Sequence, residues 1–189
     1  LVVQKKVGDK RGEAGHLMGL GSLFFEEGRN HEARVCFEAA LRLARAVGSR
    51  STEVVALGNL GDVYFTDESM AQAEIYLGQA VALGDEFYPL PAGAFRGSLA
   101  LIKARDEQFD EAYALLETGE KQIDSFPQEH AKFLCKWAEV DILAGQLDRA
   151  HAACRRARRI ADQIQVRDDS ELASTLSGLE HRLENQVEY

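Results

Sequence analysis

The sequence has few of the residues that break helices or cross-link chains, and it has no long apolar run. Only three of its 189 residues are proline and three are cysteine. Three cysteines make a disulfide framework improbable, and unpaired thiols are typical of a reducing compartment, so we expect a cytoplasmic protein. No apolar stretch approaches the length that spans a bilayer, so we expect no membrane association.

Basic residues are in the minority. Lys and Arg number 22 against 31 Asp and Glu, and the formal net charge is −9 at pH 7. Proteins that bind nucleic acids normally need a basic stripe, so we expect no nucleic-acid partner. The one basic cluster is Arg155, Arg156, Arg158 and Arg159. We interpret it as a solvated helix face, with a site for an anion or an acidic partner as the alternative.

Residues arranged for catalysis or metal binding are also scarce. The Gly-rich stretch at residues 19–22 lacks a following Gly-Lys-Ser/Thr and lies in a helical pattern, so it does not indicate a phosphate loop. The best metal-type residues are His130, Cys135, His151 and Cys154. Cys154 occupies an apolar position of its pattern, which favours packing over metal binding. We expect no enzymatic activity, no metal site and no cofactor.

What the sequence has instead is repetition. Leu20, Leu60, Leu99 and Trp137 are 40, 39 and 38 residues apart, and a small residue follows each of them. Each is also followed by a series of small and large residues: Ala33, Phe37, Ala40; Ala73, Leu77, Ala80; Ala112, Leu116, Gly119; Ala150, Cys154, Ala157. Steps of three and four place each series on one face of a helix. Self-similarity at this period indicates a stack of repeats.

Each repeat is predicted to be two antiparallel helices joined by a short turn. The turns are expected at residues 26–30, 67–69, 106–108 and 145–146, where polar residues or glycine interrupt the pattern. Gly21 and Gly61 lie inside first helices, and we expect these small residues to let the two helices of a pair approach closely.

The spacing Leu-Gly-x-x-Tyr/Phe, followed by Ala, a large residue and Ala, resembles the tetratricopeptide repeat. Lys103 and Asp141 replace the aromatic residue in the third and fourth repeats. The period exceeds the family's usual length of about 34 residues, and it is similar to that of long-period repeats in bacterial signalling and regulatory proteins. The resemblance implies an all-α, right-handed superhelical solenoid with a C-terminal capping helix.

We expect a single domain over residues 1–189. Its predicted parts are a truncated preceding repeat (1–13), four repeats (14–50, 51–88, 91–126, 128–166) and a capping helix (168–187). Val7-Gly8 repeats Val47-Gly48, which predicts that a helix ends there, and Pro89 and Pro91 predict a loop. Asp169 or Ser170 is expected to cap the last helix. That helix carries a leucine stripe (Leu172, Leu176, Leu179, Leu183) and an opposite polar side (Glu180, Arg182, Glu184, Gln186).

The resemblance also implies a function, namely binding a protein or peptide on the concave face within a larger cytoplasmic regulatory protein. The predicted groove residues are Ser22, Phe25, Asn59, Asp62, Phe65 and Arg105. Asn59 matches the family's groove asparagine, whose amide pairs with a ligand backbone; the alternative is an exposed side chain satisfied by water. The basic residues that clamp a terminal carboxylate in some members are absent from the matching positions, which hold Met18, Ser22, Ala94 and Ser98.

Two other functions stay open at this point. One is a sensor whose groove closes on a signalling peptide or small molecule and controls an upstream catalytic or DNA-binding domain. The other is self-association into a homo-oligomer through Leu1, Val3 and Val7.

Overall fold

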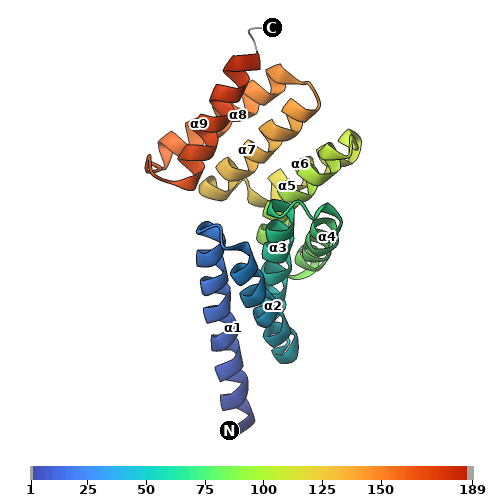
Figure 1. The fold of residues 1–189 in the computed structure, drawn as a ribbon, viewed down its shortest axis with the longest axis vertical. Helices are drawn as coiled ribbons and strands as arrows, with labels where there is room; N and C mark the ends of the chain where they lie inside the picture. The colour runs from blue at the N-terminus through green and yellow to red at the C-terminus, as the bar shows by residue number, and fades with distance from the viewer. Residues whose placement is uncertain (1, 187–189) are drawn as a thin grey trace. The chain divides into compact units, whose positions relative to one another are not determined.

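The computed structural model describes the backbone of residues 2–186 and the side chains of residues 10–185. Within these residues the chain is all-α, with helices and no strand (Figure 1). The helices are α1 (Val2–Glu26), α2 (Asn30–Val47), α3 (Arg50–Thr66), α4 (Met70–Phe87), α5 (Pro89–Arg105), α6 (Phe109–Ile123), α7 (Pro127–Leu143), α8 (Leu147–Gln163) and α9 (Glu171–Gln186). The predicted all-α helical-repeat fold is confirmed.

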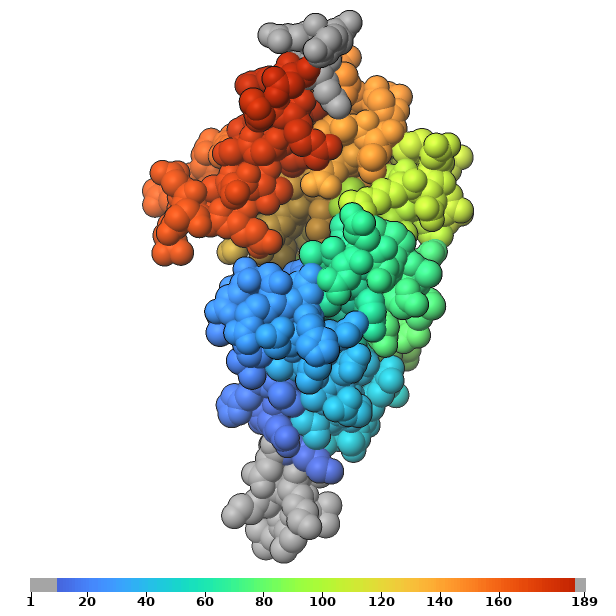
Figure 2. Space-filling view, viewed as in Figure 1, coloured from blue at the N-terminus to red at the C-terminus, as the bar shows by residue number. Residues whose placement is uncertain are grey.

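The chain forms two compact units, which divide within α5 after Phe95. In the N-terminal unit α1 pairs with α2, α3 pairs with α4, and α2 packs on α3. In the C-terminal unit α7 pairs with α8, α6 contacts α7, and α9 packs on α8 and α7. Figure 2 shows the red side chains of α9 lying against the orange ones of α8. The assignment of all residues to one domain stays a prediction.

The four turns between paired helices have the same backbone geometry. Each contains one residue with positive φ: Gly28 (73°), Glu68 (58°), Glu107 (60°) and Gly145 (69°). In each turn the N–H of this residue and the next N–H donate to carbonyl groups of the last helical turn, as Gly28 N does to Phe25 O at 3.0 Å and Arg29 N does to Phe24 O at 2.8 Å. These bonds satisfy carbonyls that the helix end leaves without partners. The predicted positions of the turns are confirmed.

The repeated small residues lie at the centres of the helix pairs. Ala33, Ala73, Ala112 and Ala150 are all 0% exposed. The large residues four positions later (Phe37, Leu77, Leu116, Cys154) are at most 3% exposed. The predicted register is therefore confirmed in all four repeats, including the two that lack the aromatic residue.

The glycines of the first helices make room for these large residues. A Cβ atom at Gly21 would lie 2.6 Å from Phe37 Cε1, and one at Gly61 would lie 2.5 Å from Leu77 Cγ. The three atoms nearest to the Cβ at Gly61 all belong to Leu77, and none belongs to Ala73. The large side chain, rather than the alanine, fills the space that glycine leaves.

Two predictions about helix boundaries are wrong. α1 runs without a break from Val2 to Glu26, so residues 2–13 extend the first helix of repeat 1 and do not end a preceding helix at Gly8; residue 1 lies outside the described residues. Pro89 begins α5, and Pro91 also lies in it. Proline is tolerated in the first turn of a helix because the N–H that it lacks has no partner there.

The capping helix is largely as expected. Its four leucines are at most 4% exposed. The Ser170 hydroxyl accepts a hydrogen bond from Ala173 N at 3.2 Å, so Ser170, and not Asp169, caps α9. One residue of the expected polar side, Glu180, is half-buried against α8 because it binds Arg158.

Candidate functional site

The first helices of the N-terminal unit, α1 and α3, are in contact and carry five of the six predicted groove residues. Their inner sides are fixed by close contacts: Gly21 against Phe37, and Gly61 against Leu77. Because these glycines face the core, the side chains next to them on the helix are turned partly outward. The five are all half-buried: Ser22, Phe25, Asn59, Asp62 and Phe65.

Asn59 and Asp62 present unused polar groups. They are three residues apart on α3 and so lie on neighbouring parts of one helix face. Within the described part of the chain, neither side chain makes a hydrogen bond or ion pair. An amide offers a donor and an acceptor, and a carboxylate offers acceptors only. A ligand on this face would meet both.

The sixth predicted residue, Arg105, belongs to the C-terminal unit, whereas the other five belong to the N-terminal unit. It is exposed at the C-terminal end of α5, in the C-terminal unit. There it contributes to the electrostatic environment of Glu139 on α7, together with Lys136 and Arg182. Burial raises the pKa of Glu139, and the three cations partly oppose that rise. The sequence does not reveal this charge cluster, because its members come from three different helices.

Ser98, one of the positions without a clamp residue, is already occupied. It is 2% exposed, and its hydroxyl lies 2.7 Å from Lys136 Nζ, which donates to it from α7. Met18, Ser22 and Ala94 are half-buried. Ser98 is therefore part of the packing of the C-terminal unit and is not free for a ligand.

The metal-type residues of the fourth repeat do not converge. His130 Nε2 is 2.9 Å from Glu120 Oε1, while Cys135 and Cys154 lie in the apolar core of the C-terminal unit. Burial raises the pKa of the Cys135 thiol to about 12 and also raises the pKa of Cys154. Among the described residues, no three His, Cys, Asp or Glu side chains are grouped to hold a metal ion.

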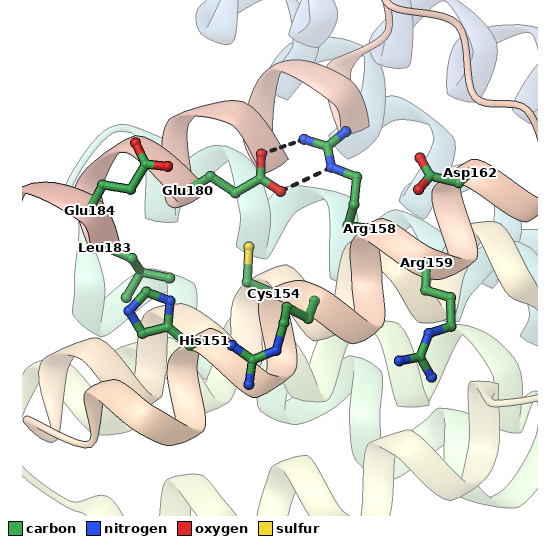
Figure 3. A pocket seen from close by; sticks show the side chains of 9 residues that line it. His151, Cys154, Arg158, Arg159, Asp162, Glu180, Leu183 and Glu184 are labelled. Carbon is green, nitrogen blue, oxygen red and sulfur yellow. Dashed lines mark hydrogen bonds and ion pairs between the residues drawn. The ribbon is translucent and has the colours of Figure 1, made fainter.

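An open pocket of about 460 Å³ lies between α8 and α9 (Figure 3). Across it Arg158 forms a two-point interaction with Glu180, in which Nε donates to Oε1 at 2.9 Å and Nη2 donates to Oε2 at 2.6 Å. The pocket is lined by His151, Cys154, Arg155, Arg158, Arg159, Asp162, Glu180, Leu183 and Glu184. Arg155, Arg156 and Arg159 are exposed, as expected for a solvated helix face, whereas Arg158 is half-buried. Arg156 is nevertheless paired, because it binds Glu120.

A second open pocket, of about 400 Å³, lies in the N-terminal unit beside the buried carboxylate of Glu53. Arg45 Nε donates to Glu53 Oε1 at 2.9 Å, and Arg50 Nη1 donates to Oε2 at 2.8 Å. Burial opposes ionisation of Glu53, but the two arginines outweigh it and hold the pKa of this carboxyl below its ordinary value. Both oxygens are therefore engaged: the bond from Arg45 fastens α3 to the end of α2, and the bond from Arg50 lies within the first turn of α3.

None of the helices in residues 2–186 combines the length and the apolar character that a membrane crossing requires.

Comparison with known proteins identifies the helix pairs. Residues 13–86 match the family described as Tetratricopeptide repeat. The crystal structure of BtubC (BKLC) from P. vanneervenii is similar, with a TM-score of 0.63 and 18% identity over 83% of this chain and 66% of that chain. A putative kinesin light chain of Podosopora anserina with nearly identical TPR-like repeats has a TM-score of 0.62 and 17% identity, over 94% of this chain and 92% of that chain. No curated protein matches this chain.

The predicted tetratricopeptide repeats are thus confirmed by sequence in residues 13–86, and the similarity of fold extends over most of the chain. This chain spans 66% of the length of the BtubC structure. The assignment to a long-period type of bacterial regulatory protein stays a prediction.

Proposed function

We propose that this chain, built from tetratricopeptide repeats, is an interaction module that holds a protein or peptide partner on the face formed by α1 and α3. Such repeats generally mediate protein–protein interaction and are typically not catalytic. The observation that carries the proposal is the unpaired amide of Asn59 on a half-buried face. A half-buried polar group without a protein partner is available to a ligand.

The chemistry of this face suits an extended backbone. The Asn59 amide can donate to a ligand carbonyl and accept from a ligand N–H, whatever the ligand's side chains are. Phe25 and Phe65 supply partly exposed aromatic surface of the kind found in interface cores. Asp62, three residues from Asn59, favours a ligand that carries a positive charge at that point.

The wider setting is part of the same proposal. The three cysteines are free and buried, which suits a reducing cytoplasm. We place the module in a larger regulatory protein, with Arg105 as a further ligand contact in the C-terminal unit. Sensing of a small effector and self-association are the competing outcomes of the experiment.

The experiment is a pull-down from host lysate with the tagged chain, followed by titration of the partner that mass spectrometry identifies. Asn59→Ala is expected to weaken binding by about 1–3 kcal/mol, because the ligand backbone would lose its partner in a desolvated contact. Phe65→Ala should also weaken it. The matched controls are Gln72→Ala and Phe87→Ala, which remove an exposed amide and an exposed aromatic ring from α4. All variants are first checked for an unchanged melting temperature.

The proposal fails if both α3 variants retain every partner that the controls retain. Loss of partners only when the arginines of α8 are neutralised would move the working surface to α8. Recovery of the chain itself as the sole partner would favour self-association.

A further inference from the structure

Helix α8 is unusually basic for an acidic protein, and most of its charge is neutralised within the C-terminal unit. Three of its arginines bind carboxylates of neighbouring helices: Arg149 with Asp141 on α7 (3.7 Å), Arg156 with Glu120 on α6, and Arg158 with Glu180 on α9 (2.6 Å). These arginines fasten α8 to the helices around it. Their positive charges are therefore neutralised by carboxylates of the same unit.

The two remaining arginines, Arg155 and Arg159, are different. Both are exposed, and within the described part of the chain neither makes a hydrogen bond or ion pair. Figure 3 shows Arg159 pointing away from Glu180, whereas Arg158 points toward it. Arg155 and Arg159 are one helical turn apart, and His151 lies one turn before them, so the three side chains follow one line along α8 at intervals of about 6 Å.

This line of side chains borders the pocket between α8 and α9, whose lining also includes Cys154 and Leu183. We propose that His151, Arg155 and Arg159 form a docking site for a protein segment that carries two carboxylates one helical turn apart. A guanidinium group binds a carboxylate through two parallel hydrogen bonds, which makes arginine suited to this partner. Two glutamates at positions i and i+4 of a helix have the same spacing as the two arginines.

The charges around the site restrict the partner to a short acidic segment. Asp148 lies seven residues before Arg155 and Asp162 three residues after Arg159, so both are on the same side of α8, and both are exposed. Glu184 on α9 borders the same pocket and is also exposed. These carboxylates repel a long polyanion such as a nucleic acid, while the two central turns attract a pair of negative charges. This surface is separate from the proposed binding face of α1 and α3 and does not depend on it.

The test uses two fluorescent synthetic helical peptides, one with two glutamates four residues apart and the other with glutamines in their place. Fluorescence anisotropy at low ionic strength should show binding of the Glu peptide to the wild-type chain and weaker binding of the Gln peptide. Replacing both arginines (Arg155→Gln with Arg159→Gln) should weaken the Glu peptide by about tenfold, as expected for two exposed charge pairs. Replacing both by lysine should weaken it less, because the charge is kept while the two-point geometry is lost.

The matched control replaces Arg11 and Arg42 by glutamine. These two exposed arginines of the N-terminal unit have no ion pair in the described structure, so the control loses the same charge elsewhere. The proposal is overturned if this control weakens the Glu peptide as much as the α8 variant does. It is also overturned if the wild-type chain does not bind the Glu peptide at about 1 mM. Tighter binding of a single-stranded oligonucleotide that depends on Arg155 and Arg159 would likewise overturn it.

Discussion

The N-terminal and C-terminal units use the same small-residue packing but differ at one position of the repeat. In the N-terminal unit this position holds Phe24 and Tyr64, and in the C-terminal unit it holds Lys103 and Asp141. The sequence match to the repeat family covers residues 13–86, within the unit that has the aromatic residues. The alanines are nevertheless fully buried in both units. Close helix packing therefore depends on the small residues and not on the aromatic one.

The variable position shows what the packing requires of its occupant. Tyr64 stacks on Tyr76 at 5.3 Å between ring centroids. Asp141, which is 1% exposed, accepts a hydrogen bond from the Tyr113 hydroxyl at 2.8 Å, and the Arg149 guanidinium lies 4.5 Å from the centre of the Tyr113 ring. A charged residue is tolerated there because a tyrosine of the preceding helix satisfies it.

Both units contain a contact between a phenylalanine and a glycine, but the contact is closer in the N-terminal unit. A phenylalanine of one first helix packs on a glycine of the preceding first helix: Phe95 on Gly58 in the N-terminal unit, and Phe133 on Gly97 in the C-terminal unit. A Cβ atom at Gly58 would lie 2.1–2.3 Å from three atoms of the Phe95 ring. At Gly97 the nearest atoms would be Lys136 Cδ at 2.9 Å and the Phe133 ring at 3.0 Å. The contact in the N-terminal unit leaves less space.

The largest expected effect comes from filling these two spaces. Gly58→Ala should destabilise the protein by about 3 kcal/mol, because the buried Phe95 ring must move, and Gly97→Ala should cost about 1 kcal/mol, because the flexible Lys136 can withdraw. Urea unfolding monitored by circular dichroism measures both. Gly78→Ala is the control, since its Cβ meets nothing within 4 Å, and it should stabilise α4 by about 0.5–1 kcal/mol. Equal costs at Gly58 and Gly97 would contradict the difference in tightness.

Removing the hydroxyl that satisfies Asp141 should have the next largest effect. Tyr113→Phe is expected to destabilise by about 2 kcal/mol at neutral pH, because it removes the hydrogen bond to a buried carboxylate and leaves only the more distant Arg149, at 3.7 Å. The same substitution in an Asp141→Leu background should cost much less, since no buried charge is then stranded. Urea unfolding of the four proteins forms a double-mutant cycle. A cycle without coupling would show that Tyr113 only fills space.

The cost of Tyr113→Phe should also depend on pH. Burial raises the pKa of Asp141 while the Tyr113 hydrogen bond opposes the rise, so Asp141 contributes most stability at acid pH and loses it as pH rises through its raised pKa. At acid pH the carboxyl is neutral and the lost hydrogen bond costs less. Burial, followed by the hydrogen bond to Asp141, raises the pKa of Tyr113 from 10.0 to about 12. The stability that the Tyr113 hydroxyl contributes is therefore fully present below pH 10 and is lost between pH 10 and 12. The cost should therefore be greatest near neutral pH and smaller at both extremes.

The smallest expected effect concerns the turns. Glu68 and Glu107 adopt positive φ where the first and last turns have glycine. A side chain in this conformation costs about 1–2 kcal/mol, part of which glycine loses again through its flexibility when unfolded. Glu107→Gly should therefore raise stability by about 0.5–1 kcal/mol, and Gly145→Ala should lower it by about 1 kcal/mol. Thermal unfolding of both variants measures this. A destabilised Glu107→Gly would show that the Glu107 side chain contributes a contact that outweighs the strain.

The sequence predicted the hairpins well because their causes are local and repeated. Periodic alanines gave the register, and polar or glycine residues gave the turns. It failed at helix boundaries that depend on the surroundings of a single residue. Gly8 resembles a helix end such as Gly48, yet α1 continues through it, and Pro89 resembles a break, yet it begins α5. Glycine and proline are each compatible with two backbone states, and only the surrounding chain selects one.

The candidate site was predictable only in part. The positions of Asn59 and Asp62 follow from the repeat, because they flank its buried Leu60-Gly61 pair on α3. The partners of Arg156 and Arg158 do not follow from it, because Glu120 and Glu180 come from helices 36 and 22 residues away. Which arginines of α8 are already neutralised, and which are left for a partner, depends on those tertiary contacts.

The reactivity of the buried cysteines reports local unfolding of the helices around them. Cys36 belongs to the N-terminal unit, Cys135 and Cys154 belong to the C-terminal unit, and burial raises the pKa of all three thiols. A thiol that is neither exposed nor ionised does not react with an alkylating reagent. Each cysteine is thus modified only when the helices around it separate. Pulse alkylation followed by peptide mass mapping therefore measures the rate of local opening of each unit separately, without any added probe.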